Sequence, residues 1–183
     1  INFKTLKLLR KKNKKIGLCH GVFDIVHKGH LEHLKFAKSK VDLLVVSITS
    51  DKFVSKAPHL PINNHNYRAS YLTFFDFVDF VYINKKETSE NIIKVLKPNV
   101  YFKGKDYKKK DITGNLKKEI HLVKKKKGKV IFSKTPMMSS SKITNNSIYE
   151  WSPIQKEILK NLAKNNTYQK IINYLDSIKK IDV

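Results

Sequence analysis

His27 and His30, two histidines three residues apart, flank Gly29 near the N-terminus of this chain. They follow a short apolar run at 16–19 that predicts a buried strand, and they precede apolar residues at helical spacing over 31–37. The first N–H groups of a helix have no partners within it, and the helix dipole favours negative charge there. Because glycine lets the backbone come close to a ligand, this spacing predicts a site where both imidazoles face one triphosphate.

Three segments carry a resemblance to a known family. Residues 21–30 (Gly-Val-Phe-Asp-Ile-Val-His-Lys-Gly-His) are similar to the signature of the nucleotidyltransferase superfamily marked by a His-x-Gly-His motif. Residues 96–107 resemble the Lys-Pro-Asp-Val-x-x-Lys-Gly-x-Asp-Tyr segment of heptose-1-phosphate adenylyltransferases, the nucleotidyl half of bifunctional ADP-heptose synthases. Residues 139–143 are similar to the Ser/Thr-rich turn that opens the last helix of the family. The matches come in the family's order and span about 16–148.

The resemblance implies nucleotidyl transfer, in which a substrate phosphate oxygen attacks the α-phosphorus of a nucleoside triphosphate and pyrophosphate leaves. A phosphate monoester is largely dianionic at neutral pH, so the reaction needs positioning and positive charge more than a strong base. By the motif match, His27 and His30 would bind the triphosphate and stabilise the α-phosphoryl group. Lys56 and Arg68 fall where the family places contacts to substrate phosphate and triphosphate, although Lys56 also fits a solvated lysine.

The other expected contacts gather in three segments. The residues expected to bind nucleotide are Gly21, Val22, Phe23, Asp24, Gly29, Lys103, Gly104, Asp106, Tyr107, Ser139, Ser140 and Ser141. Asp24 would orient a base or a metal-bound water, or cap its turn. Asp106 also fits a turn residue, and the serines fit an ordinary N-cap cluster. The sequence shows no metal-ligand cluster, so we expect Mg²⁺ to be held mainly by substrate oxygens and water.

The nucleotide and the acceptor are the least constrained part of the prediction. The leading hypothesis is ATP-dependent transfer to a sugar 1-phosphate such as D-glycero-D-manno-heptose 1-phosphate. The alternative is a CTP-dependent cytidylyltransferase acting on a polyol or amino-alcohol phosphate. Residues 134–137 (Lys-Thr-Pro-Met) lack the Arg and Gly of the Arg-Thr-x-Gly segment of such cytidylyltransferases, which weakens the CTP hypothesis. Gly104 is followed by Lys105, where adenylyltransferases often have a second glycine.

Strands and helices alternate along the chain in a way that brings these groups together. Strands are predicted at 16–20, 41–49, 80–83, 100–102 and 129–132. Helices are predicted at 29–40, 64–75, 88–96 and 116–126, with a short one ending near Lys56 and another starting near 139. The pattern predicts an α/β fold, a Rossmann-like doubly wound parallel sheet of about five strands. Because ligands bind at the carboxyl ends of such strands, the candidate residues should meet at one edge. The helix at 64–75 should carry Tyr67, Tyr71, Leu72 and Phe75 on one side.

The chain divides into a basic lead-in at 1–15, a domain at 16–150 that the resemblance identifies as a nucleotidyltransferase domain, and a C-terminal helical segment at 151–183. Ser152 and Pro153 suit the start of a helix in that segment, which we interpret as a linker or docking hairpin. Some proteins resembling ADP-heptose synthases pair the nucleotidyl domain with a sugar kinase domain, so the resemblance implies a fused kinase as a partner. It also implies a homodimer, since members of the family often form one.

The formal net charge is +23, from 38 Lys+Arg against 15 Asp+Glu. The lysines spread along the whole chain, and their clusters at 108–110 and 124–127 lack the interleaved aromatic residues of single-strand binders. We therefore interpret the charge as a solvated Lys-rich surface and expect a small-molecule phosphate substrate rather than nucleic acid. A polyanion- or RNA-binding module without activity is the alternative of a different class.

Two further features bear on the compartment. No run of about 18 apolar residues is present, so the sequence predicts no membrane span. The lone Cys19 lies in a predicted buried strand, which fits the reducing cytoplasm.

Overall fold

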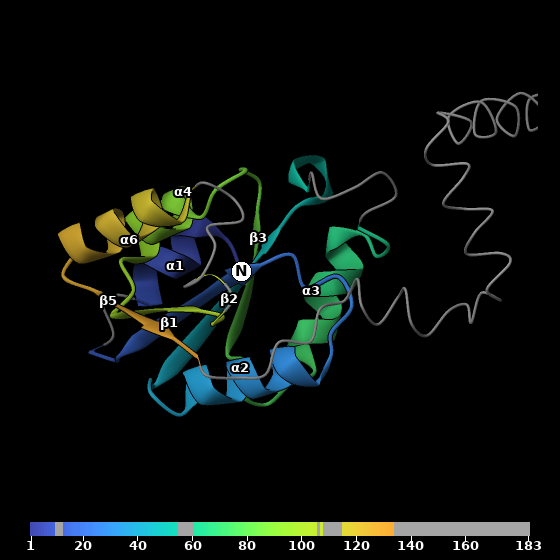
Figure 1. Cartoon of the computed structure of the whole chain (residues 1–183), viewed down its shortest axis with the longest axis horizontal. Coiled ribbons are helices and arrows are strands. Elements are labelled where there is room, and N and C mark those ends of the chain that lie inside the picture. The colour runs from blue at the N-terminus through green and yellow to red at the C-terminus, as the bar shows by residue number, and fades with distance from the viewer. Residues whose placement is uncertain (10–12, 55–60, 106, 108–114, 134–183) are drawn as a thin grey trace, which may run out of the picture. The chain divides into compact units, whose positions relative to one another are not determined.

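The computed structural model describes residues 1–9, 13–54, 61–105, 107 and 115–133 (Figure 1). Within them, five strands form one parallel sheet: β1 (Ile16–Gly21), β2 (Leu43–Thr49), β3 (Phe80–Asn84), β4 (Val100–Lys103) and β5 (Lys129–Phe132). Their order in space is β3-β2-β1-β4-β5. The α/β fold with a Rossmann-like parallel sheet, predicted from the alternation of elements, is confirmed.

In the described ranges, α1 (Phe3–Leu9) precedes the first strand, and the other helices connect consecutive strands. These are α2 (Lys28–Lys38), α3 (His65–Thr73), α4 (Glu90–Leu96) and α6 (Leu116–Lys125), and a 3₁₀ turn, η1 (Asp51–Phe53), lies between β2 and α3. The strands and α-helices end within two residues of their predicted bounds. The second strand starts later than predicted because the chain first turns at Asp42, whose carboxylate accepts a hydrogen bond from the Lys15 backbone N–H at 2.7 Å.

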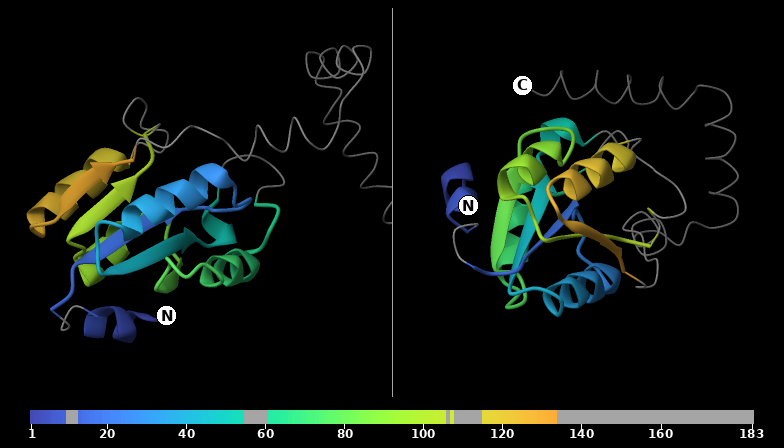
Figure 2. Two further views of the ribbon diagram at one scale, coloured as in Figure 1. Left: turned by 90° about the horizontal axis from the view of Figure 1, so that it is seen from below. Right: turned by 90° about the vertical axis from the view of Figure 1, so that its left-hand side faces the viewer.

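Two apolar cores cover the two faces of the sheet. Leu34 of α2 and Leu72 of α3 pack in one core. Leu6 of α1, Ile92 of α4 and Val123 of α6 pack in the other. Figure 2 shows α2 on the opposite side of the sheet from α4 and α6. Because both faces are covered, the central strands must be apolar on both sides, which explains the nearly continuous apolar run of β2.

Helix α3 differs from its predicted packing. Tyr67 and Tyr71 are 61% and 51% exposed, whereas Arg68 and Leu72 are fully buried. The prediction that the two tyrosines share the apolar side with Leu72 was therefore wrong. Arg68 and Leu72 are four residues apart and so lie on the same side of the helix. An arginine can occupy the inward side here because oxygens of neighbouring segments accept its hydrogen bonds.

The strand order reverses between β1 and β4. From β1 the chain builds β2 and β3 on one side and then returns to place β4 and β5 on the other. In doubly wound sheets, ligands bind beside the carboxyl ends of the strands at this switch point. The register pairs Cys19 with Phe102, so His20, the last residue but one of β1, lies beside Lys103, the last residue of β4.

Gly128, directly before β5, offers a test of the close packing between the end of α6 and the chain that precedes β4. A Cβ atom added there would lie 2.4 Å from the Pro98 carbonyl oxygen and 2.9 Å from a Val123 methyl carbon. Gly128→Ala is therefore expected to lower the free energy of unfolding by about 1–3 kcal/mol in urea denaturation. The neighbouring exposed Lys127 already has a left-handed φ of 62°, so Lys127→Ala is the matched control, with a change within about 0.5 kcal/mol. Equal stability of the two variants would contradict the prediction.

Candidate active site

A tight turn joins β1 to α2 and places the predicted motif at the switch point. Phe23 adopts a left-handed φ of 52° and is 6% exposed. Its ring folds back over Gly21, where an added Cβ would lie 3.1 Å from it. A side chain at Gly21 would therefore press on the ring that fills the turn. Gly29 is buried in the first turn of α2, which fits its predicted role of close approach.

His27 and His30 stand together at the start of α2. Their rings stack with centroids 3.9 Å apart and planes inclined by 24°, and the Phe23 ring lies 5.1 Å from His30. Burial lowers the pKa of His27, which favours the neutral ring at neutral pH. His27 occupies the N-cap position, but its side chain makes no capping hydrogen bond. Its Nδ1 atom is buried and has no hydrogen-bond partner among the described residues. In the neutral ring that carries its proton on Nε2, the Nε2–H group can donate a hydrogen bond to an anion.

Lys103 ends β4 in a largely buried position. Its side chain is 6% exposed, and its ammonium lies 3.2 Å from a carboxylate oxygen of Glu119 on α6. The same ammonium lies 5.1 Å from the ring centroid of Tyr101 and 4.7 Å from that of Tyr107. Gly104 continues the chain, and its carbonyl accepts the Tyr107 backbone N–H at 3.2 Å. The structure thus brings Lys103, Gly104 and Tyr107 together beside the end of β1.

His20 is a residue of this edge that the sequence analysis missed. It lies beside Lys103 at the end of β1, and its Nδ1 atom is 3.1 Å from the Ser47 hydroxyl oxygen of β2. Burial lowers the pKa of His20 to about 4, and the positive charge of Lys103 contributes in the same direction. The ring is therefore neutral at neutral pH and adds no charge to the site. Its position, directly before the glycine that ends the strand, was the available signal.

The neutral state of His20 predicts how stability depends on pH. An unfolded histidine takes up its proton near pH 6.5, whereas the folded chain keeps His20 neutral down to about pH 4. The unfolded state therefore binds more protons between these values, so stability falls as the pH is lowered through them. We expect the titration of His20 to lower the free energy of unfolding by about 2 kcal/mol as the pH falls from 6.5 to 4.5. Urea unfolding of His20→Asn should show a flatter pH dependence than the unmodified chain. His121→Asn, at an exposed position, is the matched control. If the free energy of unfolding changes equally with pH in all three proteins, the assignment of a neutral His20 is refuted.

Asp24 fastens the turn to the segment that precedes α3. Its carboxylate accepts hydrogen bonds from the backbone N–H groups of Ile62 and Asn63 at 2.8 and 2.9 Å. The Asn63 amide donates to the Asp24 carbonyl at 3.0 Å. The carboxylate thus holds a neighbouring segment, and its orientation of a base or a metal-bound water stays a prediction.

Arg68 holds the same region from inside. Its guanidinium donates to the carbonyl of Val22, to those of Asn63 at 2.9 Å and Thr49 at 2.7 Å, and to the Asp51 carboxylate at 2.6 Å. Burial alone would raise the pKa of Asp51, but hydrogen bonds from Arg68 and His65 lower it. Arg68 thereby joins the β1–α2 turn, the end of β2 and the start of α3. These contacts are to protein oxygens, whereas the motif match predicts contact with the triphosphate.

Several predicted site residues lie outside the described residues. They are Lys56, Asp106, Ser139, Ser140 and Ser141. The predicted helical segment at 151–183 also lies outside them.

Glu119 is the second site residue that the sequence analysis missed. Leu116, Glu119 and Val123 are the buried residues of α6, at a spacing that puts a carboxylate on the apolar side of a Lys-rich helix. That spacing was a readable signal. Burial would raise the pKa of Glu119, but the nearby Lys103 ammonium and the hydroxyl of Ser89 hold it below its ordinary value.

Within the described ranges, no group of three or more His, Cys, Asp and Glu side chains is placed to hold a metal ion. In the same part of the chain, no helix is long and apolar enough to span a membrane.

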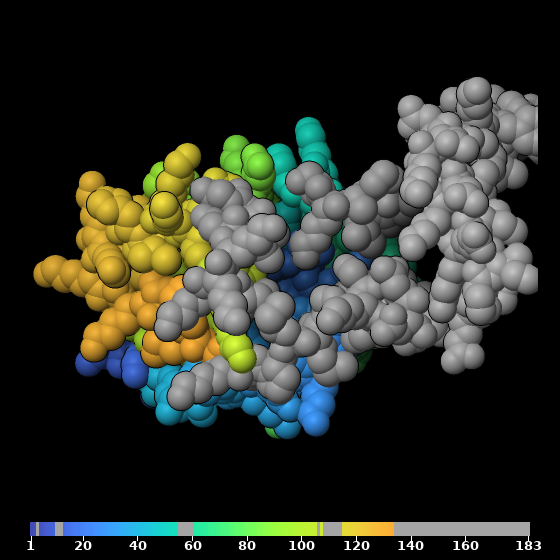
Figure 3. Space-filling view, in the orientation of Figure 1, coloured from blue at the N-terminus to red at the C-terminus, as the bar shows by residue number. Residues whose placement is uncertain are grey.

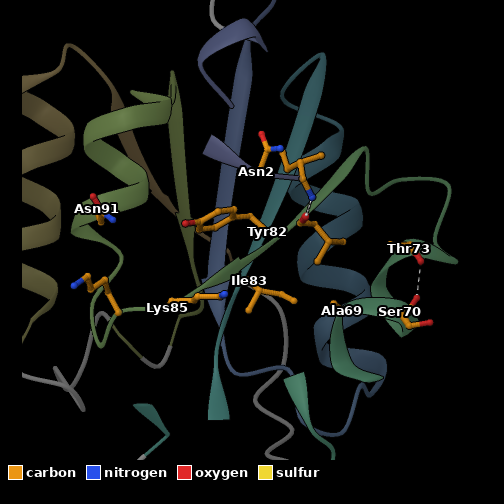
Figure 4. Close-up of a pocket in the computed structure, with 11 residues that line it drawn as sticks. Asn2, Ala69, Ser70, Thr73, Tyr82, Ile83, Lys85 and Asn91 are labelled. Atoms are coloured by element: carbon orange, nitrogen blue, oxygen red, sulfur yellow. Dashed lines mark hydrogen bonds between the residues drawn. The ribbon is translucent and has the colours of Figure 1, made fainter. Parts of the chain in front are cut away.

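A hollow of about 610 Å³ lies away from the candidate site, between the first residues of the chain, α3 and β3 (Figure 4). Its lining includes Ala69 and Ser70 of α3, Tyr82 and Ile83 of β3, and Lys85. It contains none of the predicted site residues.

Helix α6 carries several exposed lysines. Figure 3 shows long side chains of this helix, in yellow, projecting into solvent. Lys117, Lys118, Lys124 and Lys125 of α6 are all exposed. Charges placed this way raise the local concentration of anionic ligands without forming a defined site.

Comparison with known proteins decides the family. A family model described as cytidylyltransferase-like matches residues 18–147, most of the chain. The chain belongs to the cytidylyltransferase-like family. This assignment supports the prediction of a nucleotidyltransferase, and the matched range includes both histidines and Lys103.

The relatives of this cytidylyltransferase-like chain are longer proteins. Bifunctional protein HldE of Campylobacter jejuni (strain RM1221) is 42% identical over 121 residues, which cover 64% of this chain and 26% of the relative. HldE of Campylobacter concisus is 41% identical over 125 residues, or 67% of this chain and 26% of the relative. HldE of Nitratiruptor is 39% identical over 126 residues, or 67% and 27%. The chain thus spans about a quarter of the length of these relatives.

Two solved structures share the fold of this family member. The lipopolysaccharide core biosynthesis protein from Thermoplasma volcanium aligns with a TM-score of 0.58 at 24% identity, covering 68% of this chain and 100% of that one. Pantoate-beta-alanine ligase from Francisella tularensis aligns with a TM-score of 0.55 at 20% identity, covering 89% and 76%. These similarities support the Rossmann-like fold.

Proposed function

We propose that this chain transfers the adenylyl group of ATP to a sugar 1-phosphate, with D-glycero-D-manno-heptose 1-phosphate as the acceptor and pyrophosphate as the second product. Its membership of the cytidylyltransferase-like family supports the reaction type. The resemblance of residues 96–107 to heptose-1-phosphate adenylyltransferases, together with the HldE relatives, supports the acceptor.

One observation carries the proposal. The β1–α2 turn with His27 and His30, and Lys103 at the end of β4, lie at adjacent strand ends where the sheet order reverses. Backbone N–H groups of a helix start, a neutral imidazole and an ammonium all suit phosphate oxygens. The carboxylates near this edge are bonded to protein groups, Asp24 to backbone N–H groups and Glu119 to Ser89, Tyr101 and Lys103.

The protein contributes positioning and positive charge to the reaction. A phosphate oxygen of the acceptor forms a bond to the α-phosphorus, and the bond from that phosphorus to the pyrophosphate oxygen breaks. His27 and His30 donate hydrogen bonds to the α-phosphoryl oxygens as negative charge builds on them. Lys103 supplies positive charge from the other side, and the start of α2 supplies backbone N–H groups. Holding the two phosphates in line supplies the remainder of the rate enhancement.

We propose Mg²⁺ as the cofactor, bound chiefly by triphosphate oxygens and water. The described groups at this edge are nitrogen donors that favour anions, and Mg²⁺ prefers oxygen ligands. The residues therefore fit a metal that arrives with the nucleotide. It would neutralise charge on the β- and γ-phosphates when bound.

The remaining predicted contacts stay part of the proposal. Lys56, Asp106, Ser139, Ser140 and Ser141 would contact phosphate or nucleotide, as the motif match implies. Arg68 acts in this proposal by holding the β1–α2 turn rather than by touching the triphosphate. The homodimer, the fused sugar kinase domain and the cytoplasmic location stay predictions.

The test is pyrophosphate release by the purified chain with Mg²⁺. ATP and CTP are each offered with heptose 1-phosphates, hexose 1-phosphates and polyol phosphates. Release with ATP and a heptose 1-phosphate alone supports the proposal, and release with CTP and a polyol phosphate replaces it with the cytidylyltransferase alternative. No release with any pair, combined with a salt-dependent shift of nonspecific RNA that ATP does not alter, would favour the polyanion-binding module.

A further inference from the structure

A buried polar cluster connects α4 and α6 to the ligand edge of the sheet. Glu119 is 3% exposed, and one of its oxygens accepts from the Ser89 hydroxyl at 2.6 Å and from the Ser89 backbone N–H at 3.2 Å. Its other oxygen accepts from the Tyr101 hydroxyl at 2.9 Å and lies 3.2 Å from the Lys103 ammonium. Both carboxylate oxygens are thus fixed, and the only positive charge they meet among the described residues is that of Lys103.

The cluster leaves Lys103 little freedom of position. Its ammonium has the Tyr101 ring 5.1 Å away, the Tyr107 ring 4.7 Å away and the Glu119 carboxylate 3.2 Å away. A lysine side chain is long and flexible, and as a point charge it lacks the directional fork of arginine. Neighbouring groups must therefore fix the position of the ammonium, and here two aromatic rings and one carboxylate surround it.

We propose that Glu119 is a positioning residue, which holds the Lys103 ammonium at the end of β4 in the place where it binds the triphosphate. This inference rests on the proposed function. Ser89 and Tyr101 fix the carboxylate by their hydrogen bonds, and the carboxylate fixes the ammonium. The role reaches the nucleotide only through Lys103.

The direction in which Glu119→Gln changes ATP affinity separates a positioning role from a purely electrostatic one. A carboxylate near an anion site repels the anion, so on charge alone Glu119→Gln would strengthen ATP binding. If Glu119 positions Lys103, the same substitution weakens ATP binding, because the ammonium loses its partner and its place. The Gln side chain keeps the size of Glu and an oxygen acceptor, which limits the disturbance of Ser89 and Tyr101.

The experiment measures the Kd of Mg–ATP by titration calorimetry, which needs no acceptor. We expect Glu119→Gln and Lys103→Met each to weaken binding by about tenfold, the scale of one charge-assisted hydrogen bond. In the Lys103→Met background, Glu119→Gln should cause no further loss, because its effect passes through Lys103. Glu90→Gln, on α4 and paired with Lys94 at the surface, removes the same charge elsewhere and is the matched control.

Each outcome has a defined meaning. ATP binding by Glu119→Gln that equals or exceeds that of the unmodified chain overturns the inference and leaves the proposed function intact. Equal losses in both backgrounds overturn it too, since a merely structural role would not depend on Lys103. If Glu119→Gln does not fold, Glu119→Asp replaces it. The Asp side chain keeps the negative charge but is shorter, so its carboxylate lies farther from the Lys103 ammonium. Unchanged Mg–ATP binding by this variant would again overturn the inference. Failure of the unmodified chain to bind ATP would overturn the proposed function and this inference with it.

Discussion

His30→Ala is expected to lower kcat for pyrophosphate release by about 10²- to 10³-fold, the usual cost of removing one donor that stabilises charge in a transition state. The imidazole of His30 stacks on that of His27 at the start of α2, where charge on the α-phosphoryl group would build. Removing it takes away a donor from one side of that group, while the backbone N–H groups remain. The loss should therefore appear mainly in kcat and less in the KM for ATP.

The measurement is steady-state pyrophosphate release with Mg²⁺, with circular dichroism of each protein to confirm its fold. His121→Ala, at an exposed position of α6, removes the same side chain away from the site and should keep full activity. Full activity of His30→Ala would contradict the proposed site. A rise in KM with unchanged kcat would instead mean that His30 contributes only to binding the nucleotide.

Arg68→Met is expected to lower the free energy of unfolding by about 3–5 kcal/mol, because it removes the donor of three backbone carbonyls and of Asp51, and each unsatisfied acceptor that is shielded from water costs about 1–3 kcal/mol. The substitution leaves the carbonyls of Val22 and Thr49 without their donor and removes a partner of Asp51. Small domains are stable by about 5–15 kcal/mol, so this loss would bring the chain close to unfolding. Arg68→Lys should recover only part of it, because one ammonium cannot reach all of these acceptors.

Urea unfolding at pH 7 checks this expectation. Tyr67→Ala, next in the chain but 61% exposed, is the matched control and should change stability by about 0.5 kcal/mol or less. The result also separates two roles of Arg68. Retained stability with weakened ATP binding would support direct contact with the triphosphate, as the motif match implied, whereas lost stability supports its role in holding the turn.

The arrangement of the sheet could be predicted because its signals are local. The apolar run of β2 and the glycine that ends β1 depend only on neighbouring residues in the chain. The rule that parallel strands present ligands at their carboxyl ends then predicted that the β1–α2 turn and Lys103 would meet. In the structure, Cys19 pairs directly with Phe102, so the carboxyl ends of β1 and β4, from which the turn and Lys103 follow, lie side by side.

The functions of individual polar side chains could not be predicted in the same way. Asp24, Arg68 and Lys103 were all assigned to ligand binding from their place in a motif. The structure gives each of them protein partners that lie far away in the chain, from Asn63 for Asp24 to Glu119 for Lys103. A motif records which residue types stand at which spacing, but it does not contain the distant groups that accept or donate their hydrogen bonds.

The family, the alternation of strands and helices and the position of the histidine pair follow from the sequence alone, because periodicity, turn residues and motif spacing are properties of short segments. The burial of Arg68 and the exposure of Tyr67 and Tyr71 depend instead on how distant segments pack. The same holds for His20 beside Lys103 and for Glu119 within 3.2 Å of the Lys103 ammonium. The physical reason is that a buried charge is tolerated only where partners surround it, and those partners come from segments that folding brings together.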